Sequence, residues 1–346
     1  MARLKSRIVV VTGASAGIGR AIATAFARKH SKVALIARGL AGLEGARRDV
    51  EAAGGEALII PTDVAEPDAV FAAAHRVEEE WGPIDVWVNA AMATVFSPFA
   101  DLSAEEYKRA TEVTYLGSVY GTMAALERMR PRNRGTIVQV GSALGYRAIP
   151  LQAPYCGAKF AIRGYLQSLR AELIHDKSRV HVCEVQLAAF NTPQFDWGRN
   201  HMPQRPQPMP PIFQPEVAAK AVVWAATHKR REIWVGAPSA QMILASRWVP
   251  DWIMDAVMAR KGYGGQLTDE PEIPGRPDNL FTPVDGDFGT HGRFDGRAKA
   301  DSLQTVLSLH RGLTLVAASL AIGVATGLAL GRKSGGAWDQ GSRPYR

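Results

Sequence analysis

A glycine-rich turn close to the N-terminus limits the possible folds of this chain more than any other feature. Gly13, Gly17 and Gly19 follow an apolar strand-like run, Ile8 to Val11, and a helix is expected to begin around Ile18. Glycines at this spacing allow a tight turn, a close approach of the backbone to a pyrophosphate, and close packing of the helix. The N-terminus of that helix adds free N–H groups and the positive end of its dipole.

The alternation of expected strands and helices after this turn predicts a parallel sheet. Residues 5–90 form three βα units, a pattern typical of a doubly wound sheet covered by helices. We expect seven strands, and a capping box at Ser103 and Glu106 predicts a long helix that ends near Met129. The predicted strands cover residues 8–11, 32–37, 56–60, 84–88, 136–140, 179–186 and 232–235. The predicted fold class is therefore α/β, a Rossmann-type doubly wound seven-stranded parallel sheet.

A second group of residues suggests chemistry. Ser142 follows the strand at 136–140, where open α/β sheets bind ligands, and Tyr155 and Lys159 share one face of the next helix. An ammonium one turn away, together with the positive ring of an oxidised nicotinamide, would favour the phenolate of Tyr155. The Ser142 hydroxyl could then hold a carbonyl or alcohol oxygen while Tyr155 moves the proton. A chance pair on a solvated helix face is the alternative for Tyr155 and Lys159 alone.

Together, the T-G-x-x-x-G-I-G turn and the S…Y-x-x-x-K group resemble the short-chain dehydrogenase/reductase family over about residues 5–236. The resemblance implies a Rossmann fold, NAD(H) or NADP(H), and interconversion of carbonyls and alcohols. Tyr155 would be the acid/base, Lys159 the group that binds ribose and lowers the pKa of Tyr155, and Ser142 the hydroxyl that orients substrate. The cofactor-binding residues of the turn would be Gly13, Ser15, Gly17, Ile18 and Gly19.

Two further positions bear on the nucleotide. The second strand ends at Ala37-Arg38, where an acidic residue would bind the ribose of NAD, whereas Arg38 could pair with a 2′-phosphate. NADP(H) is therefore preferred over NAD(H), unless Arg38 is a solvated surface arginine. Asp63 and Val64 resemble the family's pair that contacts adenine, and a helix cap is the alternative for Asp63.

The chain departs from the family pattern in three places. Asn89, which the resemblance implies as a cofactor-binding residue, is kept, but Ala90 and Met92 stand where N-N-A-G is usual. Thr114 stands where the family has the asparagine that positions water in its proton relay, so the resemblance implies a catalytic role for Thr114, with less reach than asparagine. The usual P-G after the sixth strand is absent, while Thr192 stands where a threonine would hold the nicotinamide carboxamide.

Composition excludes several classes of function. The net charge is +8, from 41 basic and 33 acidic residues, but residues 311–346 alone contribute +4. This distribution argues against a general nucleic-acid surface and for a tail near a membrane. Two cysteines, Cys156 and Cys183, indicate a reducing compartment without a disulfide framework. No metal site is expected, and the N-terminus runs directly into the first strand, so no signal peptide is expected.

The predicted organisation has five parts. A catalytic domain, 1–238, includes a lid or substrate loop at 195–215, for which a stiff surface loop is the alternative. Residues 239–261 form an amphipathic helical segment with Trp248 and Trp252 that could cover the site, bind a second subunit in a homo-oligomer, or lie on a membrane. Residues 262–310 are predicted to be an irregular linker, 311–333 a transmembrane helix with 20 uncharged residues, and 334–346 a tail.

The sequence therefore predicts an NADP(H)-dependent oxidoreductase with its catalytic domain in the cytoplasm, attached to a membrane at its C-terminal end. A lipophilic small-molecule substrate is expected because several apolar residues follow strand ends, where a substrate would bind. These are Phe96, Phe99, Ile149, Leu151, Phe190 and Phe195. The rival interpretation is a cofactor-binding regulatory or scaffold protein on the same fold. An extended sugar-nucleotide epimerase is disfavoured by the glycine spacing and the C-terminal half.

Overall fold

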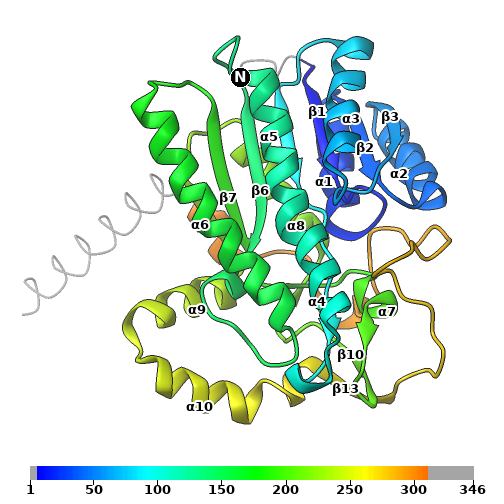
Figure 1. Cartoon of the computed structure of the whole chain (residues 1–346), viewed down its shortest axis with the longest axis vertical. Helices are drawn as coiled ribbons and strands as arrows, with labels where there is room; N and C mark the ends of the chain where they lie inside the picture. The colour runs from blue at the N-terminus through cyan, green and yellow to red at the C-terminus, as the bar shows by residue number, and fades with distance from the viewer. Residues whose placement is uncertain (1–5, 311–346) are drawn as a thin grey trace, which may run out of the picture. The chain divides into compact units, whose positions relative to one another are not determined.

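The computed structural model describes residues 6–310, and seven parallel strands form its central sheet (Figure 1). The strand order is β12-β7-β6-β4-β1-β2-β3, which is the predicted doubly wound arrangement. Valine, isoleucine and leucine side chains fill both faces of these strands, as expected for a sheet covered by helices on each side. The strands are β1 (Ile8–Thr12), β2 (Lys32–Ala37), β3 (Glu56–Pro61), β4 (Val86–Asn89), β6 (Thr136–Ser142), β7 (His181–Leu187) and β12 (Glu232–Val235).

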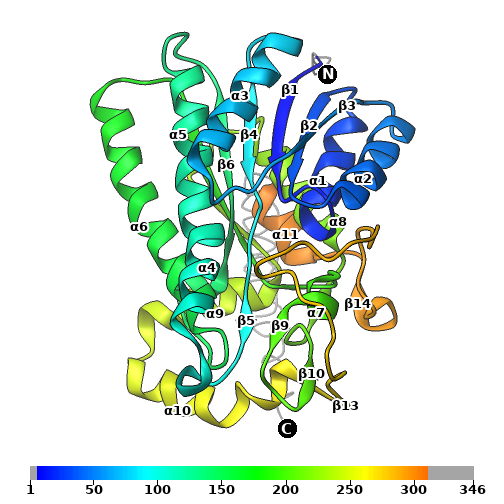
Figure 2. The same cartoon turned by 45° about the vertical axis from the view of Figure 1, so that its right-hand side comes forward.

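Two layers of helices cover the sheet (Figure 2). One face carries α1 (Gly17–Ala27), α2 (Leu40–Ala52) and α8 (Pro215–Ala225), and the other carries α3 (Pro67–Trp81), α5 (Gly117–Met129) and α6 (Ala153–His175). The direction of winding reverses between β1 and β4, and this switch point opens a crevice at the carboxyl ends of the strands. The site is built around that crevice.

The predicted long helix is present but contains a π-helical turn. Ser103 and Glu106 form both hydrogen bonds of the capping box at the start of α4 (Ala104–Thr111). The turn η2 (Glu112–Leu116) then connects α4 to α5. A single π turn inside an α-helix is frequent at functional sites, and Thr114 lies within this one.

The segment predicted to be an irregular linker, 262–310, contains regular elements. The composition indicates an irregular segment, yet β13 (Leu267–Pro271) and β14 (Ala298–Lys299) lie within it and pair with strands that precede them by many residues. These pairings with β10 (Gln204–Pro206) and β11 (Ile212–Phe213) supply backbone partners that a local reading of composition cannot reveal.

Short elements surround the carboxyl ends of the main strands (Figure 1). They are β5 (Val95–Phe96), η1 (Phe99–Asp101), η3 (Ala143–Gly145), β8 (Ala189–Phe190), α7 (Gln194–Trp197), β9 (Arg199–Asn200), α9 (Ala237–Trp248), α10 (Asp251–Lys261), η4 (Gly264–Gln266), η5 (Asp295–Arg297) and α11 (Leu303–Leu309). Contacts divide the chain into two units, Met1–Thr305 and Val306–Arg346, and the site described below belongs to the first. Across residues 6–310 every helix is too short or too polar to cross a bilayer. The predicted transmembrane helix at 311–333 and the tail at 334–346 lie outside the described residues.

Candidate active site

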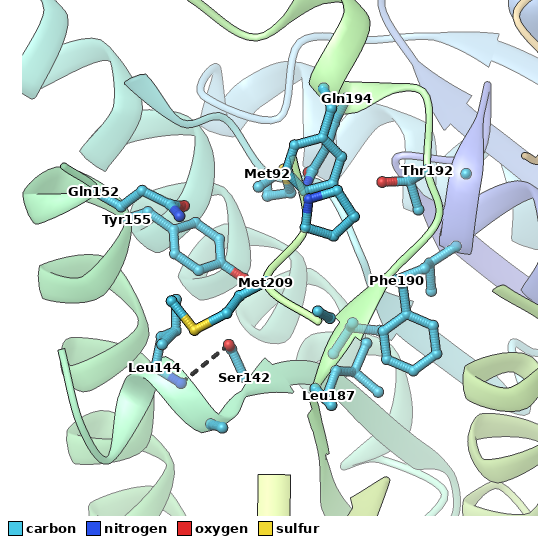
Figure 3. A pocket seen from close by; sticks show the side chains of 18 of the residues that line it. Met92, Ser142, Leu144, Gln152, Tyr155, Leu187, Phe190, Thr192, Gln194 and Met209 are labelled. Atoms are coloured by element: carbon cyan, nitrogen blue, oxygen red, sulfur yellow. Dashed lines mark hydrogen bonds between the residues drawn. The ribbon is translucent and has the colours of Figure 1, made fainter. Parts of the chain in front are cut away.

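Ser142, Tyr155 and Lys159 come together at the carboxyl end of β6. Ser142 is the last residue of that strand, and Tyr155 and Lys159 occupy the first two turns of α6, which Pro154 helps to begin. The Ser142 Oγ accepts a hydrogen bond from the backbone N–H of Leu144 at 3.1 Å, which fixes the hydroxyl (Figure 3). The hydroxyls of Ser142 and Tyr155 point toward the same part of the cavity.

Burial dominates the protonation of this group. Desolvation raises the pKa of Tyr155 to about 12, although a hydrogen bond with Ser142 opposes the shift. Desolvation also lowers the pKa of Lys159 to about 8, and the Glu184 carboxylate opposes that shift. The Lys159 ammonium donates to the carbonyl oxygen of Val140 at 2.9 Å and lies 5.3 Å from the centroid of the Tyr155 ring. In the free protein burial outweighs the other causes at Tyr155, and the lowering of its pKa by Lys159 stays a prediction.

A cavity of about 300 Å³ joins these residues to the glycine-rich turn. Ser15 and Ile18 line it together with the three glycines, and Ser142, Tyr155 and Lys159 lie at its other end. Lys159 is the only charged side chain among the described residues that line the cavity, and that ammonium is already bonded to Val140. Apart from Lys159, the described residues that line the cavity are therefore uncharged.

The turn has the shape that a dinucleotide requires. A Cβ on Gly13 would lie 2.8 Å from the backbone of Ala91, and a Cβ on Gly19 would lie 2.1 Å from the carbonyl oxygen of Gly13. Gly13 and Gly17 also have positive φ angles, 69° and 55°. Side chains at these positions would collide with neighbouring backbone or strain the turn, so the close packing of the turn and the helix requires glycine.

Thr192 provides an independent sign of a missing ligand group. Its Oγ1 is buried and has no hydrogen-bond partner among the described residues, and its side chain faces the cavity opposite Tyr155 (Figure 3). A buried hydroxyl without a partner is costly, and at the wall of a cavity a ligand group can supply the partner. A carboxamide would fit this hydroxyl, and binding of the nicotinamide carboxamide by Thr192, which the family resemblance implies, stays a prediction.

A second cavity of about 120 Å³ holds the remaining nucleotide residues. Arg38, Asp63 and Val64 line it, next to Gly13 and Ser15. Asp63 accepts a hydrogen bond from the N–H of Ala65 at 3.0 Å and pairs with Arg109. Arg38 donates to the backbone carbonyl of Phe281 at 2.8 Å, and burial lowers the pKa of its guanidinium. Arg38 is thus not a freely solvated arginine, and Asp63 does not cap α3, which begins after Glu66.

Asn89 and Thr114 lie behind the cavities and line neither of them. Asn89 accepts from the Trp87 indole at 2.8 Å and donates to the Thr122 hydroxyl at 3.0 Å, so its side chain connects β4 to α5. Thr114 is buried against Ala93, which follows β4. The structure thus places neither side chain in the cavity lining, where the sequence analysis expected cofactor binding by Asn89 and catalysis by Thr114.

Sequence reasoning named none of the residues that close the cavity from the C-terminal side, although it offered covering of the site as one role of residues 239–261. Met242 on α9 lines the first cavity, Gln266 is almost fully buried beside it, and Asn279 reaches both cavities. No short sequence motif marks Met242, Gln266 or Asn279. The only signal in the sequence is that a long segment follows Gly236. The predicted lid does contribute, because Phe195, Trp197 and residues 207–210 line the first cavity.

The fold and the site together define a nucleotide-binding oxidoreductase of the Rossmann type. A family model described as short chain dehydrogenase matches residues 7–201, and the chain belongs to the short-chain dehydrogenase/reductase family. It is therefore an NAD(P)-dependent oxidoreductase, and the scaffold interpretation is set aside.

Similar proteins agree with this assignment. The chain is 30% identical over 293 residues to an uncharacterized oxidoreductase, YxnA, of Bacillus subtilis, covering 84% of this chain and 81% of the relative. It is 30% identical over 263 residues to the uncharacterized oxidoreductase Mb1570 of Mycobacterium bovis, covering 74% of each. It is 36% identical over 174 residues to dehydrogenase/reductase SDR family member 7 of Homo sapiens, covering 49% of this chain and 51% of the relative.

Proposed function

We propose that this enzyme interconverts a carbonyl and an alcohol on a lipophilic substrate, with NADP(H) preferred over NAD(H). The observation that carries the proposal is one cavity with the glycine-rich turn at one end and Ser142 and Tyr155 at the other. Bound NADP(H) would supply or accept the hydride. The turn would hold its pyrophosphate, Thr192 its carboxamide, and Lys159 its ribose.

Ser142 and Tyr155 would handle the substrate oxygen. The fixed Ser142 hydroxyl donates a hydrogen bond to that oxygen and orients it. During reduction Tyr155 gives its proton to the same oxygen, and during oxidation it takes the proton back. A pKa of about 12 keeps the phenol protonated, which suits the donor role in reduction. In oxidation, the positive ring of the oxidised nicotinamide would supply the charge that favours the phenolate.

The preference for a lipophilic substrate rests on the cavity wall. Of the six apolar residues expected near the substrate, Ile149, Phe190 and Phe195 line the cavity. Phe96 and Leu151 are buried behind it, and Phe99 is 72% exposed on the surface. Leu144, Met209 and Met242 add apolar surface, and the polar lining there comes from neutral amides such as Gln152. An uncharged wall of this kind disfavours anionic and cationic substrates, because it would desolvate their charge without a partner.

The preference for NADP(H) rests on Ala37 and Arg38. Ala37 offers no carboxylate for a ribose 2′-hydroxyl, and the Arg38 guanidinium lies in the second cavity. The hydrogen bonds that Arg38 makes to described residues use Nη1 and Nη2 only, so the Nε–H remains for a phosphate oxygen.

Membrane attachment through 311–333 belongs to the same proposal, and its support is the 20-residue uncharged run between Arg311 and Arg332. Trp248 and Trp252, at 83% and 72% exposure, provide aromatic side chains suited to a headgroup region.

Tyr155→Phe tests the chemistry directly. The variant should lose at least about 100-fold in turnover of a carbonyl identified by an NADPH-oxidation screen, because it lacks the transferable proton. Its affinity for NADPH, measured by fluorescence titration, should stay within about threefold of the wild type, since the ring remains. Tyr165→Phe, on the same helix but outside the cavity lining, is the matched control. A Tyr155→Phe enzyme that keeps most of its turnover would refute the assignment.

A further inference from the structure

Residues 279–289, called the strap below, cross the nucleotide end of the cleft although they come late in the chain. Asn279, Pro283, Val284, Gly286 and Phe288 line the second cavity, opposite the glycine-rich turn and Arg38. In Figure 1 this part of the gold trace runs beside α1 and α2. The N-terminal strands and helices line one side of the second cavity, and the strap lines the other side.

One end of the strap is held by two arginines. Arg38 donates to the carbonyl oxygens of Phe281 at 2.8 Å and Leu280 at 3.4 Å, and also to that of Asn279. Arg109 donates to the Leu280 carbonyl at 3.1 Å. The Leu280 side chain is fully buried in the core cluster beneath. This end is therefore an integral part of the domain.

The ion pairs at the other end are made by one carboxylate, beside a ring contact of Phe288 with Trp197 at 4.5 Å between centroids. Asp287 forms ion pairs with Arg20 on α1 and, at 3.0 Å, with Arg48 on α2. Arg20 is buried and its second partner is Asp49 on α2. The backbone on each side of Asp287 is permissive, because Gly286 and Gly289 have positive φ angles of 136° and 68°. Asp287 thus fixes a segment whose flanking residues can rearrange.

The strap also occupies a group that a dinucleotide needs. The backbone N–H of Gly17, the first residue of α1, donates to the carbonyl of Gly289 at 3.1 Å. Free N–H groups at this helix N-terminus are the donors that bind a pyrophosphate. The pyrophosphate and the Gly289 carbonyl therefore compete for one donor, and the strap has to shift near Gly289 before the pyrophosphate can bind there.

We propose that the strap is the outer wall of the dinucleotide site and that Asp287 is its latch. The inference rests on the proposed use of NADP(H). The dinucleotide enters and leaves only when the pairs of Asp287 with Arg20 and Arg48 open, and the pairs close again over the bound molecule. Because the latch is closed in both the free and the bound states, it slows association and dissociation more than it changes the affinity.

The rates of NADPH binding and release test this proposal on the full chain. Stopped-flow fluorescence gives the association rate, and displacement by excess NADP⁺ gives the dissociation rate. Asp287→Asn should raise both rates about tenfold or more and leave the Kd within about threefold of the wild type. Asp285→Asn is the matched control, because Asp285 is exposed on the same strap and forms no ion pair with any described residue. Its rates should equal those of the wild type.

A second variant opens the latch without touching it. A Cβ on Gly45 of α2 would lie 2.2 Å from the Asp287 Oδ2, so Gly45→Ala should push the carboxylate away from Arg20. Alanine also has a higher helix propensity than glycine, so α2 itself is not weakened. Gly45→Ala should raise the rates of NADPH association and dissociation as Asp287→Asn does. It tests the strap proposal even if Asp287→Asn fails to fold.

Hydrogen exchange provides a readout independent of rates. NADPH should change the protection of amides in 286–289 in the wild type, where the strap has to rearrange.

Wild-type binding rates in both Asp287→Asn and Gly45→Ala would overturn the strap proposal while leaving the proposed function standing. A wild-type chain that binds neither NADPH nor NADH would overturn the proposed function, and the strap proposal with it.

Discussion

Thr114 and Ala93 exchange two hydrogen bonds, each 2.9 Å long. The Thr114 hydroxyl donates to the Ala93 carbonyl, and the Ala93 N–H donates to the same hydroxyl. One side chain thereby ties the π-helical turn η2 to the segment after β4 that forms a wall of the site. The threonine performs the bridging task with a single oxygen, whereas an asparagine would bring a separate donor and acceptor.

Two substitutions at Thr114 separate its structural role, the hydrogen bonds to Ala93, from a role in catalysis. Thr114→Val should destabilise the fold by about 2–4 kcal/mol in urea unfolding, because it leaves the N–H and carbonyl of Ala93 buried without a partner. Thr114→Asn should keep the free energy of unfolding within about 1 kcal/mol and keep or raise turnover, since its amide replaces both bonds. Loss of activity in a folded Thr114→Asn enzyme would mean that the threonine has a role of its own, such as contact with substrate.

Arg38→Ala tests the choice of cofactor. The variant should bind NADPH about 10–100-fold more weakly in fluorescence titrations, because a charge-assisted hydrogen bond to the 2′-phosphate contributes about 1.5–3 kcal/mol. NADH, which lacks that phosphate, should change by less than about threefold. Arg38 also holds the strap, so Asp287→Asn is the necessary comparison, and it should affect both cofactors alike. Equal losses for NADPH and NADH in Arg38→Ala would contradict the assignment.

Lys159 should give stability a measurable pH dependence. Its pKa is about 8 in the folded protein, below the value near 10.4 of an unfolded chain. Between pH 8 and 10 the unfolded chain therefore binds more protons at this site, and the contribution of Lys159 to stability rises with pH. Relative to wild type, the free energy of unfolding of Lys159→Met should fall by about 2–3 kcal/mol over this range.

The comparison is made as a difference because buried thiols and phenols act in the opposite sense. Burial raises the pKa of Cys156 to about 11 and of Cys183 to about 12, so their contributions to stability decline as the pH rises above about 9. The wild type and the variant share these thiol contributions, which therefore cancel in the difference between their free energies of unfolding. Lys29→Met, at an exposed position, is the control and should follow the wild-type profile. A constant difference between Lys159→Met and wild type across pH 8–10 would argue against a depressed pKa.

Carbonate extraction tests the membrane anchor. The full chain should pellet with membranes, and a chain truncated after Arg311 should stay in the supernatant, because it lacks the 20 uncharged residues at 312–331. Replacing Trp248 and Trp252 by alanine in the truncated chain should have no effect on its fractionation. Recovery of the full chain in the supernatant would remove the anchor and most of the argument for a substrate drawn from a membrane.

The sequence alone predicts the sheet, and it names several of the residues that line the candidate site. Glycines with fixed spacing, an apolar strand and a Y-x-x-x-K pair are local signals, and each of them specifies a local geometry. Gly13, Ser142 and Tyr155 therefore lie along one cavity, as expected. The doubly wound arrangement is predictable because helices between consecutive strands allow few arrangements of a parallel sheet.

What the sequence could not reveal depends on contacts between distant residues. The Gly-, Pro- and Asp-rich composition of 262–301 indicates disorder, yet Leu280 is buried and Asp287 is paired with Arg20. The pKa of Tyr155 was also beyond reach, because it depends on how completely the fold removes water from the phenol. Spacing along a helix shows that Lys159 is near, but not that its ammonium is directed to Val140.

The burial of Leu280 has a consequence for biosynthesis. Arg38 and Leu280 are 242 positions apart, and Leu280 shares a core cluster with Ile60, Val64 and Val113. A ribosome therefore releases β1, β2 and β3 long before the side chain that completes their core has been made. Until then the nascent domain exposes an apolar hollow, and exposed surface of this kind makes a partly folded chain prone to aggregate. Folding should thus finish only near the end of translation, and a nascent chain stalled before residue 280 should remain a chaperone client.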